Sequence, residues 1–382
     1  MYKIAVVGAG FTGAVIARQL AEAGFTVSVF DERKHVAGNC HTSRDSETGI
    51  IVHKYGPHIF HTNDKFIWEY VSRFGELVPY TNRVKAVHDG HVYTLPINLL
   101  TINNFFGKTF GPKEAQQFLA SISDKTISSS ITFEQQALSF IGKELYEAFF
   151  KEYTYKQWGL LPTELPASIL KRLPVRFNYD DNYYNSQFQG IPREGYTAIV
   201  ERILNHDKIT VHLRQNVDRN ISPQFSHVFY SGPIDSWFSY RFGSLRYRTL
   251  EFQREVHSGD YQGNAVINYP DSDVPFTRIT EHKHFSPWET HSETVIFKEF
   301  SRDWSFGDIQ YYPIRLVHDK QQLREYHKIA QDEENVTFVG RLGTYRYLDM
   351  HVAIKEALEC VEMFLNCRRD GISMPSFCVD IL

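Results

Sequence analysis

A glycine-rich turn near the start of the chain has the spacing of a nucleotide-binding loop. The turn is Gly8-Ala9-Gly10-Phe11-Thr12-Gly13, and it joins the apolar run 3–7 to a helix rich in small residues. Such glycines allow a tight turn and close backbone approach to a pyrophosphate, while the first N–H groups of the helix attract phosphate. A second apolar run, 26–30, ends on Asp31, which is placed to hydrogen-bond a ribose and to disfavour a ribose phosphate. The pattern predicts FAD or NAD rather than NADP.

A second glycine turn favours FAD over NAD. Ala37-Gly38-Asn39 follows the acid closely, as in FAD proteins of the glutathione-reductase type, where such a turn lies along the extended dinucleotide. The same fold is expected to resume in the apolar runs 227–231 and 336–339, which lead into Gly232 and into Gly340-Arg341. The FAD-binding domain is therefore predicted to be discontinuous.

The middle of the chain is dense in aromatic residues and arginines. Aromatic faces stack on a base and arginine forks grip diphosphate oxygens, so this mixture suits a nucleotide diphosphate. Ordinary core and surface residues are the competing interpretation, because aromatics at helical spacing are more often core. The residues concerned are Phe149, Phe150, Tyr153, Tyr155, Trp158, Lys171, Arg172, Arg176, Tyr183 and Tyr184, followed later by Arg278, Tyr312, Arg341 and Tyr347.

Histidines cluster around the segment Tyr55-Gly56-Pro57-His58-Ile59-Phe60-His61-Thr62. His53, His58 and His61 do not fall on one face of a strand or helix, so we expect no metal site. A glycine-proline turn passing under a flavin, with His61 near its reactive edge, is the favoured interpretation. No nucleophile elbow or Walker loop is present, so the cofactor is expected to carry the chemistry.

Composition narrows the class of protein. The 382 residues include 41 basic and 45 acidic side chains, a net charge of −4, which argues against nucleic acid or an anionic membrane as partner. The four cysteines have no Cys-x-x-Cys spacing and the first strand follows no charged-then-apolar leader, so we expect a soluble cytoplasmic protein. No apolar run reaches about 18 residues, so we expect no membrane span.

Hydrophobic periodicity predicts an α/β fold, in which a Rossmann-like FAD-binding domain of the glutathione-reductase type carries an inserted helical domain and an antiparallel β-sheet domain. The FAD-binding domain is expected at 1–80, 190–245 and 320–367, the helical domain at 95–185 with helices over 115–122 and 133–151, and the sheet domain at 81–94 and 246–319. Asp349 is a candidate N-cap of a final amphipathic helix, and the tail 368–382 is expected to be loose.

Several long strings closely resemble the flavin-dependent bacterial UDP-galactopyranose mutases, from the first strand to about residue 366. Besides the segments at 8–13 and 55–62, the resemblance rests on 153–159 (YTYKQWG), 165–176 (LPASILKRLPVR), 277–283 (TRITEHK) and 340–350 (GRLGTYRYLDM). The departures are small: Ala37 stands where many relatives have glycine, and Tyr184 where phenylalanine is expected.

The resemblance implies that UDP-galactopyranose and UDP-galactofuranose are interconverted through a covalent adduct between reduced flavin N5 and the sugar's anomeric carbon. It implies that Arg172, on a mobile loop at 165–176, and Arg278 stabilise the UDP leaving group, and that His61 lies near N5. The implied substrate-binding residues are Phe149, Tyr153, Trp158, Tyr183, Tyr184, Arg248, Asn268, Tyr312 and Tyr347. The implied cofactor-binding residues are Gly8, Gly10, Phe11, Gly13, Asp31, Gly38, Asn39, His58, Ile59, Gly232, Arg341, Leu348, Asp349 and Met350.

The resemblance further implies NAD(P)H as external reductant, a homodimer, and a product used in lipopolysaccharide O-antigen or another cell-surface polysaccharide. Other functions stay open at this point. The same chemistry could act on UDP-N-acetylgalactosamine or dTDP-fucose, since these differ by a few pocket contacts. An amine oxidase-like oxidoreductase shares the FAD domain, but paired arginines would repel an ammonium substrate. A non-catalytic sugar-nucleotide binder is a further hypothesis.

Overall fold

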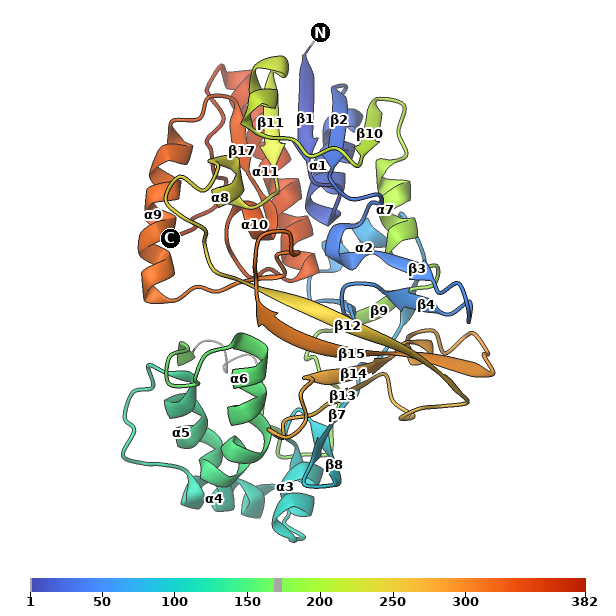
Figure 1. The fold of residues 1–382 in the computed structure, drawn as a ribbon, viewed down its shortest axis with the longest axis vertical. Helices are drawn as coiled ribbons and strands as arrows, with labels where there is room; N and C mark the ends of the chain where they lie inside the picture. Colours follow the sequence, from blue (N-terminus) through green and yellow to red (C-terminus); the bar gives the residue numbers. More distant parts are fainter. Residues whose placement is uncertain (1, 168–173) are drawn as a thin grey trace.

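The computed structural model describes residues 2–167 and 174–382, so Arg172 lies outside the described residues. The upper part of the molecule is built on a parallel sheet in the order β10-β2-β1-β11-β17 (Figure 1). Its strands are β1 (Lys3–Val7), β2 (Thr26–Asp31), β10 (Ile209–Leu213), β11 (His227–Tyr230) and β17 (Val336–Phe338). The predicted Rossmann-like fold is confirmed.

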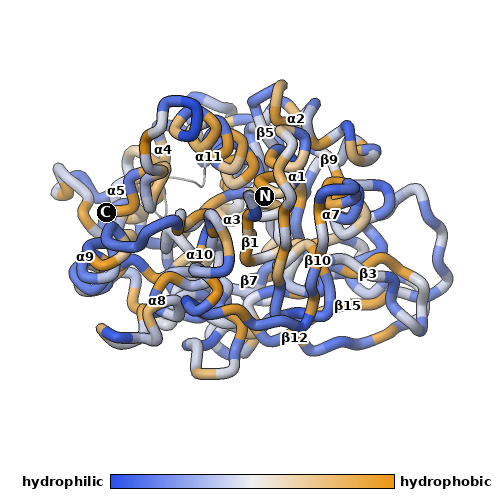
Figure 2. The backbone as a smooth tube through the Cα atoms, turned by 90° about the horizontal axis from the view of Figure 1, so that it is seen from above, coloured by the Kyte–Doolittle hydropathy of each residue, from blue (hydrophilic) through white to orange (hydrophobic). Residues whose placement is uncertain are grey.

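Helices cover both faces of this sheet, which explains why β1 is apolar from Ile4 to Val7 rather than alternating between apolar and polar residues. Side chains of β1 alternate between two cores: Ile4 and Val6 pack with helices on one face, and Ala5 packs on the other. The first face carries α1 (Phe11–Glu22), α7 (Tyr196–Leu204) and α11 (Met350–Asp370), and the second carries α8 (Ile234–Trp237) and α9 (Val317–Gln331). Hydrophobic stretches run through α1 and α11, which pack together (Figure 2).

A seven-stranded sheet crosses the middle of the molecule in the order β16-β12-β15-β14-β13-β7-β8. Its strands are β7 (Val84–His88), β8 (His91–Leu95), β12 (Tyr247–Ser258), β13 (Val266–Asn268), β14 (Arg278–Glu281), β15 (Glu293–Asp303) and β16 (Tyr312–Pro313). The prediction of an antiparallel sheet holds for every pair except β13 and β7, which run parallel. A parallel pair is possible here because a long stretch of chain separates the two strands.

The lower part is helical, with α3 (Leu99–Phe106), α4 (Pro112–Ile122), α5 (Phe133–Tyr146) and α6 (Glu152–Trp158) (Figure 1). Helix α4 starts earlier than expected, because Pro112 suits a first turn and Glu114 accepts the Gly111 N–H at 2.7 Å. The predicted helix over 133–151 is interrupted at Gly142, whose φ is 79°, and ends in a π-helical turn over Glu147–Lys151.

Short elements connect the large layers. They are β3 (Thr42–Arg44), β4 (Ile51–His53), β5 (Phe60–Thr62), α2 (Lys65–Ser72), β6 (Leu77–Pro79), β9 (Phe188–Pro192) and α10 (Gly340–Gly343). Strands β3 and β4 pair with each other, and β5, β9 and β6 form a small antiparallel sheet. Among the described residues, no helix is both long and apolar enough to cross a membrane.

The expectation of a loose C-terminal tail is wrong. After α11 the chain folds back along β17, where the Phe338 N–H donates to the Ser376 carbonyl at 2.8 Å. The Thr337 hydroxyl donates to the Pro375 carbonyl at 2.8 Å, and Ile381 is 1% exposed. The tail therefore covers the edge of the parallel sheet and satisfies backbone groups that would otherwise stay open.

Candidate functional site

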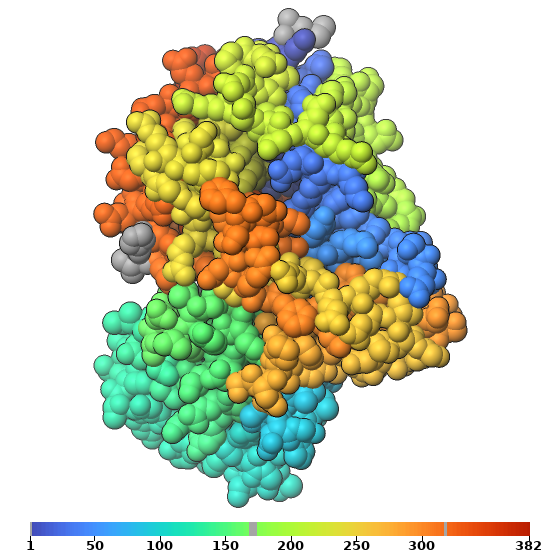
Figure 3. All heavy atoms as spheres, in the orientation of Figure 1, coloured from blue at the N-terminus to red at the C-terminus, as the bar shows by residue number. Residues whose placement is uncertain are grey.

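A cavity of about 750 Å³ lies where the parallel strands end, at the position where sheets of this kind hold ligands. We name it the sheet-edge cavity. The loop after β15 also borders it, and this orange segment lies between the blue N-terminal part and the yellow part in Figure 3. Among the residues that line it are the predicted cofactor residues Gly8, Gly10, Phe11, Asp31, Gly38, Asn39, His58, Gly232, Arg341, Leu348 and Met350.

The two predicted glycine turns meet at the floor of this cavity. Gly8 has φ +101°, and a Cβ there would stand 2.0 Å from the Ser231 hydroxyl. A Cβ on Gly10 would approach Gly38 no closer than 3.9 Å, so the space above it is open for a ligand. Helix α1 begins here without a side-chain cap, which leaves its first N–H groups available to an anion.

Three predicted cofactor residues do not line the cavity. Gly13 packs α1 against β1, because a Cβ there would stand 1.9 Å from the Gly8 carbonyl oxygen. Ile59 is 4% exposed and belongs to a hydrophobic cluster. Asp349 precedes α11, but its side chain makes no capping hydrogen bond, and it lies beside His61. Ala37, the departure from glycine, adopts φ 75°, a left-handed conformation that favours glycine.

The Asp31 carboxylate is placed at the end of β2 by backbone hydrogen bonds. One oxygen accepts the Ala9 N–H at 2.8 Å and the other accepts the Arg33 N–H at 2.9 Å. These bonds tie the acid to the glycine turn, while its position on the cavity wall leaves acceptor capacity for a ribose hydroxyl.

Arg33 is a cavity residue that the sequence analysis missed. Its Nη2 donates to Asn39 Oδ1 at 2.9 Å, and its guanidinium lies 4.7 Å from the centre of the Tyr55 ring. Its Nη1 is buried without a partner among the described residues. A buried donor of this kind is costly unless an acceptor reaches it, so the site fits an anionic ligand such as the pyrophosphate of FAD. In the sequence, Arg33 stands in a charged run that resembles any solvated surface.

The predicted flavin edge contains His58 and His61. His58 bonds the Gly56 carbonyl through Nδ1 at 2.9 Å, and burial lowers its pKa to about 4. His61 stacks on Tyr184 with ring centres 3.9 Å apart. Burial lowers the pKa of His61, although Asp349 acts in the opposite direction. Both rings are therefore neutral near pH 7 and can accept or donate hydrogen bonds without adding charge.

His53 Nδ1 accepts the His58 N–H at 3.0 Å, and among the described residues neither histidine belongs to a group whose potential ligand atoms come together. His61 instead comes near Asp349 and His351, and the potential ligand atoms of these residues lie within 4.8 Å of one another. This proximity of a carboxylate was not visible in the sequence, because α11 brings it from a distant segment.

A second, smaller cavity of about 110 Å³ lies between the helical part, which includes α6, and the seven-stranded sheet. We name it the aromatic pocket. Five predicted substrate residues line it from separate segments: Phe149, Tyr153, Trp158, Tyr183 and Asn268. Other aromatic and aliphatic side chains complete the wall, so the pocket suits the flat face of a base.

Arg278 stands beside this pocket and is held from two sides. Its Nη2 donates to Tyr153 Oη at 2.9 Å, and its Nε lies 3.2 Å from Glu299 Oε1 as an ion pair. Glu299 is 2% exposed and directly faces Arg278 across β14 and β15. Burial raises the pKa of Tyr153 to about 12, although Arg278 acts in the opposite direction, so this hydroxyl stays protonated. The sequence analysis did not identify Glu299.

A stack of side chains joins the two cavities. Tyr312 and Tyr347 lie parallel with ring centres 5.7 Å apart, and the Arg341 guanidinium lies 4.8 Å from the centre of the Tyr347 ring. Arg341 lines the sheet-edge cavity, and its Nη2 donates to the Leu348 carbonyl at 2.5 Å. Trp158 of the aromatic pocket is 6.5 Å from Tyr312 between ring centres. These contacts connect the wall of the aromatic pocket with the wall of the sheet-edge cavity.

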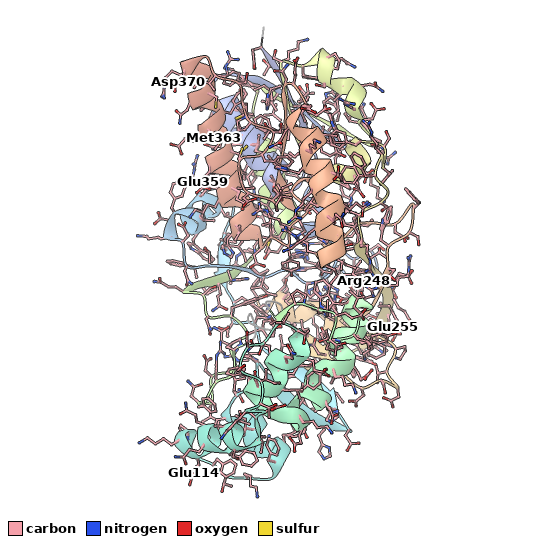
Figure 4. The ribbon with its side chains drawn as sticks, turned by 90° about the vertical axis from the view of Figure 1, so that its left-hand side faces the viewer. Glu114, Arg248, Glu255, Glu359, Met363 and Asp370 are labelled. Atoms are coloured by element: carbon pink, nitrogen blue, oxygen red, sulfur yellow. The ribbon has the colours of Figure 1, made fainter. Side chains whose placement is uncertain are left out.

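Arg248 was predicted to bind substrate, but the structure places it elsewhere. It is 3% exposed, and its guanidinium donates to the carbonyls of Lys156 and Gln157 at the end of α6 and pairs with Asp303 at 2.5 Å. Figure 4 labels Arg248 where the sheet meets the helical part. The residue fastens α6 to the sheet, and the aromatic pocket is lined by other side chains.

Comparison with known proteins gives consistent matches. A family model described as UDP-galactopyranose mutase matches residues 148–347, and one described as an NAD(P)-binding Rossmann-like domain matches residues 6–74. A probable UDP-galactopyranose mutase of Klebsiella pneumoniae is 55% identical over 99% of both chains. A dTDP-fucopyranose mutase of Escherichia coli is 50% identical over 97% of this chain and 100% of that one.

Solved structures agree at the level of the fold. A reduced UDP-galactopyranose mutase matches with a TM-score of 0.76 at 14% identity, over 96% of each chain. A cyclohexylamine oxidase of Brevibacterium oxydans matches with a TM-score of 0.58 at 14% identity, over 96% of this chain and 99% of that one. With 55% identity along nearly its whole length to one relative, and with the family model covering its central half, the chain belongs to the UDP-galactopyranose mutase family.

Proposed function

We propose that this protein is an FAD-dependent isomerase that interconverts UDP-galactopyranose and UDP-galactofuranose. The observation that carries the proposal is the side-chain stack that joins the aromatic pocket and Arg278 to the sheet-edge cavity. A nucleoside diphosphate in the pocket would extend its sugar toward a flavin in the cavity. The 55% identical relative from Klebsiella pneumoniae is itself described as a probable UDP-galactopyranose mutase.

The residues that line the sheet-edge cavity have the chemical groups that FAD binding requires. The open space over Gly10 and the unpartnered Nη1 of Arg33 would receive the pyrophosphate, and the Asp31 carboxylate would accept from the ribose. Arg341, at the other end, would place a positive charge beside the reduced ring. Reduced flavin would supply a nucleophilic nitrogen, N5, for the anomeric carbon of the sugar.

The chain's own residues would bind the substrate and stabilise the departing UDP. Tyr153, Trp158 and Tyr183 would hold the base and ribose in the aromatic pocket. Glu299 and Tyr153 hold the Arg278 guanidinium in place. This guanidinium would bind the diphosphate as UDP leaves and returns. His61 would lie at the reactive edge as a neutral ring. Arg172 is assigned the closing contact to the diphosphate from the resemblance alone.

A second candidate substrate is dTDP-fucopyranose. The 50% identical relative from Escherichia coli is described as a dTDP-fucopyranose mutase, and its match spans the whole of that protein. Uracil and thymine differ by one methyl group, which an apolar pocket discriminates only weakly. UDP-N-acetylgalactosamine stays a further possibility within the same chemistry.

The proposal extends to the cellular setting. We propose a cytoplasmic homodimer, reduced by NAD(P)H, that supplies galactofuranose for lipopolysaccharide O-antigen or another cell-surface polysaccharide. The four cysteines lack Cys-x-x-Cys spacing, which supports a reducing compartment.

Anaerobic turnover tests the proposal. Purified protein reduced with dithionite is incubated with UDP-galactofuranose, and UDP-galactopyranose is followed by anion-exchange chromatography, with oxidised protein as the control. Conversion by the reduced protein alone is expected. Conversion of dTDP-fucofuranose but not of the UDP-sugar would shift the assignment to the second candidate. In a separate aerobic incubation, stoichiometric consumption of dioxygen would favour an oxidase. Activity of the fully oxidised protein would contradict the mechanism.

A further inference from the structure

The ammonium group of Lys156 lies inside the turn that connects β13 to β14. Its Nζ is within 2.5 to 3.3 Å of four backbone carbonyl oxygens, those of Tyr269, Asp271, Val274 and Phe276. An ammonium has only three N–H groups, so the four acceptors converge on it and share its protons. The ammonium thereby holds the four carbonyl groups of the turn together, as a bound metal ion would.

The turn controls the spacing of two residues at the site. Strand β13 ends at Asn268 and β14 begins at Arg278, and these two residues face each other in register. Asn268 lines the aromatic pocket, while Arg278 donates to Tyr153. Lys156 stands on α6, three residues after Tyr153, so the same helix contacts both the turn and the arginine that follows it. The turn thus connects α6 to the two strand ends that carry Asn268 and Arg278.

A second anchor holds the outer side of the turn. The Asp271 carboxylate pairs with His88 Nδ1 at 2.5 Å and accepts the Asp89 N–H at 2.9 Å. This anchor belongs to the β7–β8 hairpin and not to α6. Loss of Lys156 would therefore leave the turn attached to the sheet while releasing it from the helix that carries Tyr153.

We propose that Lys156 is a positioning residue that holds Arg278 and Asn268 at the correct distance from α6 for a nucleoside diphosphate. The inference rests on the proposed function, in which Arg278 binds the diphosphate. Lys156 itself does not contact the substrate, since its ammonium is occupied by the carbonyls of the turn.

The test is a double-mutant cycle on UDP binding, measured by titration calorimetry with the FAD-loaded protein. Lys156→Met is expected to weaken UDP binding roughly tenfold, because a small displacement of Arg278 misaligns its contacts. Lys151→Met, at an exposed lysine just before α6, is the matched control and is expected to bind UDP normally. In an Arg278→Ala background, Lys156→Met is expected to weaken UDP binding only about twofold, well below tenfold, because the effect through Arg278 is gone and only the effect through Asn268 remains.

Distinct results would overturn the inference and the proposed function. Normal UDP binding by Lys156→Met beside weakened binding by Arg278→Ala would overturn the positioning role alone. Fully additive losses would also overturn it, since they would show that Lys156 acts independently of Arg278. Normal UDP binding by Arg278→Ala would overturn the diphosphate assignment and the inference with it. Circular dichroism and FAD content check folding, and Lys156→Gln takes the place of Lys156→Met in the cycle if the methionine variant does not fold.

Discussion

Replacement of Arg278 by alanine is expected to damage the protein in two separable ways. The first concerns stability, because the substitution removes the cation that lies 3.2 Å from Glu299, a carboxylate that is 2% exposed. A buried charge left without its partner lowers the free energy of unfolding by about 3–5 kcal/mol. The second concerns turnover: under the proposed function, loss of the charge-assisted contact to the leaving group is expected to cost about 2–4 kcal/mol of transition-state stabilisation, or about 30- to 1000-fold in kcat.

A second substitution separates the two effects. Arg278→Ala combined with Glu299→Gln removes the unpaired charge, so most of the lost unfolding free energy should return. The kcat should stay low, because the amide does not replace the guanidinium at the diphosphate. Urea unfolding followed by circular dichroism measures the first quantity, and anaerobic turnover of the reduced enzyme at saturating substrate measures the second.

The reasoning is refuted if the double variant regains turnover together with stability, because Arg278 would then act only through the fold. A loss of less than about tenfold in kcat for Arg278→Ala would equally contradict its role at the leaving group. Unchanged stability of the single variant would contradict the expected cost of leaving the Glu299 carboxylate unpaired.

The remaining predictions concern the cofactor cavity, the buried core and the tail. Gly10→Ala should leave the thermal stability of the FAD-free protein unchanged but weaken FAD binding, measured by fluorescence titration. Gly13→Ala should lower both the stability and the FAD affinity, because its Cβ would stand 1.9 Å from the Gly8 carbonyl oxygen. Equal effects of the two variants would contradict the different roles assigned to these glycines. Burial lowers the pKa of His227 from 6.5 to about 4. Its neutral ring therefore makes its full contribution to the free energy of unfolding above pH 6.5. This contribution, about 3 kcal/mol at most, is lost as pH falls toward 4. His227→Phe should therefore flatten the decline of unfolding free energy between pH 6.5 and 4, and an unchanged slope would assign that decline to other groups. The sulfur atoms of Cys360 and Cys378 lie 2.8 Å apart, so diamide should convert the two thiols to a disulfide that raises the melting temperature. Mass spectrometry should detect the disulfide as the loss of two hydrogens, and the Cys360→Ser variant should not form it. Failure to cross-link under full oxidation would count against this geometry.

The nucleotide-binding half of the site could be predicted from the sequence because its determinants are local. The turn from Gly8 to Gly13 and the acid at Asp31 lie within one β-α-β unit, where strand, turn and helix are set by near neighbours. Their meeting with Gly232 and Arg341 also followed, since each of these residues comes within three residues of the end of an apolar strand.

The surroundings of the aromatic pocket and Arg278 were harder to predict because they depend on strand register and on distant pairs. Glu299 reaches Arg278 only because β14 and β15 pair at that register, which the apolar pattern of the two strands does not determine. Lys156 reads as an ordinary charged residue in the sequence, and the contacts of Arg248 with the end of α6 emerge only when α6 is placed on the sheet. The tail was misjudged for a related reason: its composition looks loose, but the open edge of β17 gives it partners.

The order in which the parallel sheet is assembled has a consequence for synthesis on the ribosome. Its strands come from residues 3–7, 26–31, 209–213, 227–230 and 336–338, so the edge strand and the tail that covers it emerge last. During most of translation the nascent N-terminal β-α-β unit lacks β11, its neighbour on one side, and half of the cavity wall. Premature termination anywhere before β17 would leave exposed strand edges, so shortened products should aggregate or be degraded rather than persist as a free cofactor-binding fragment.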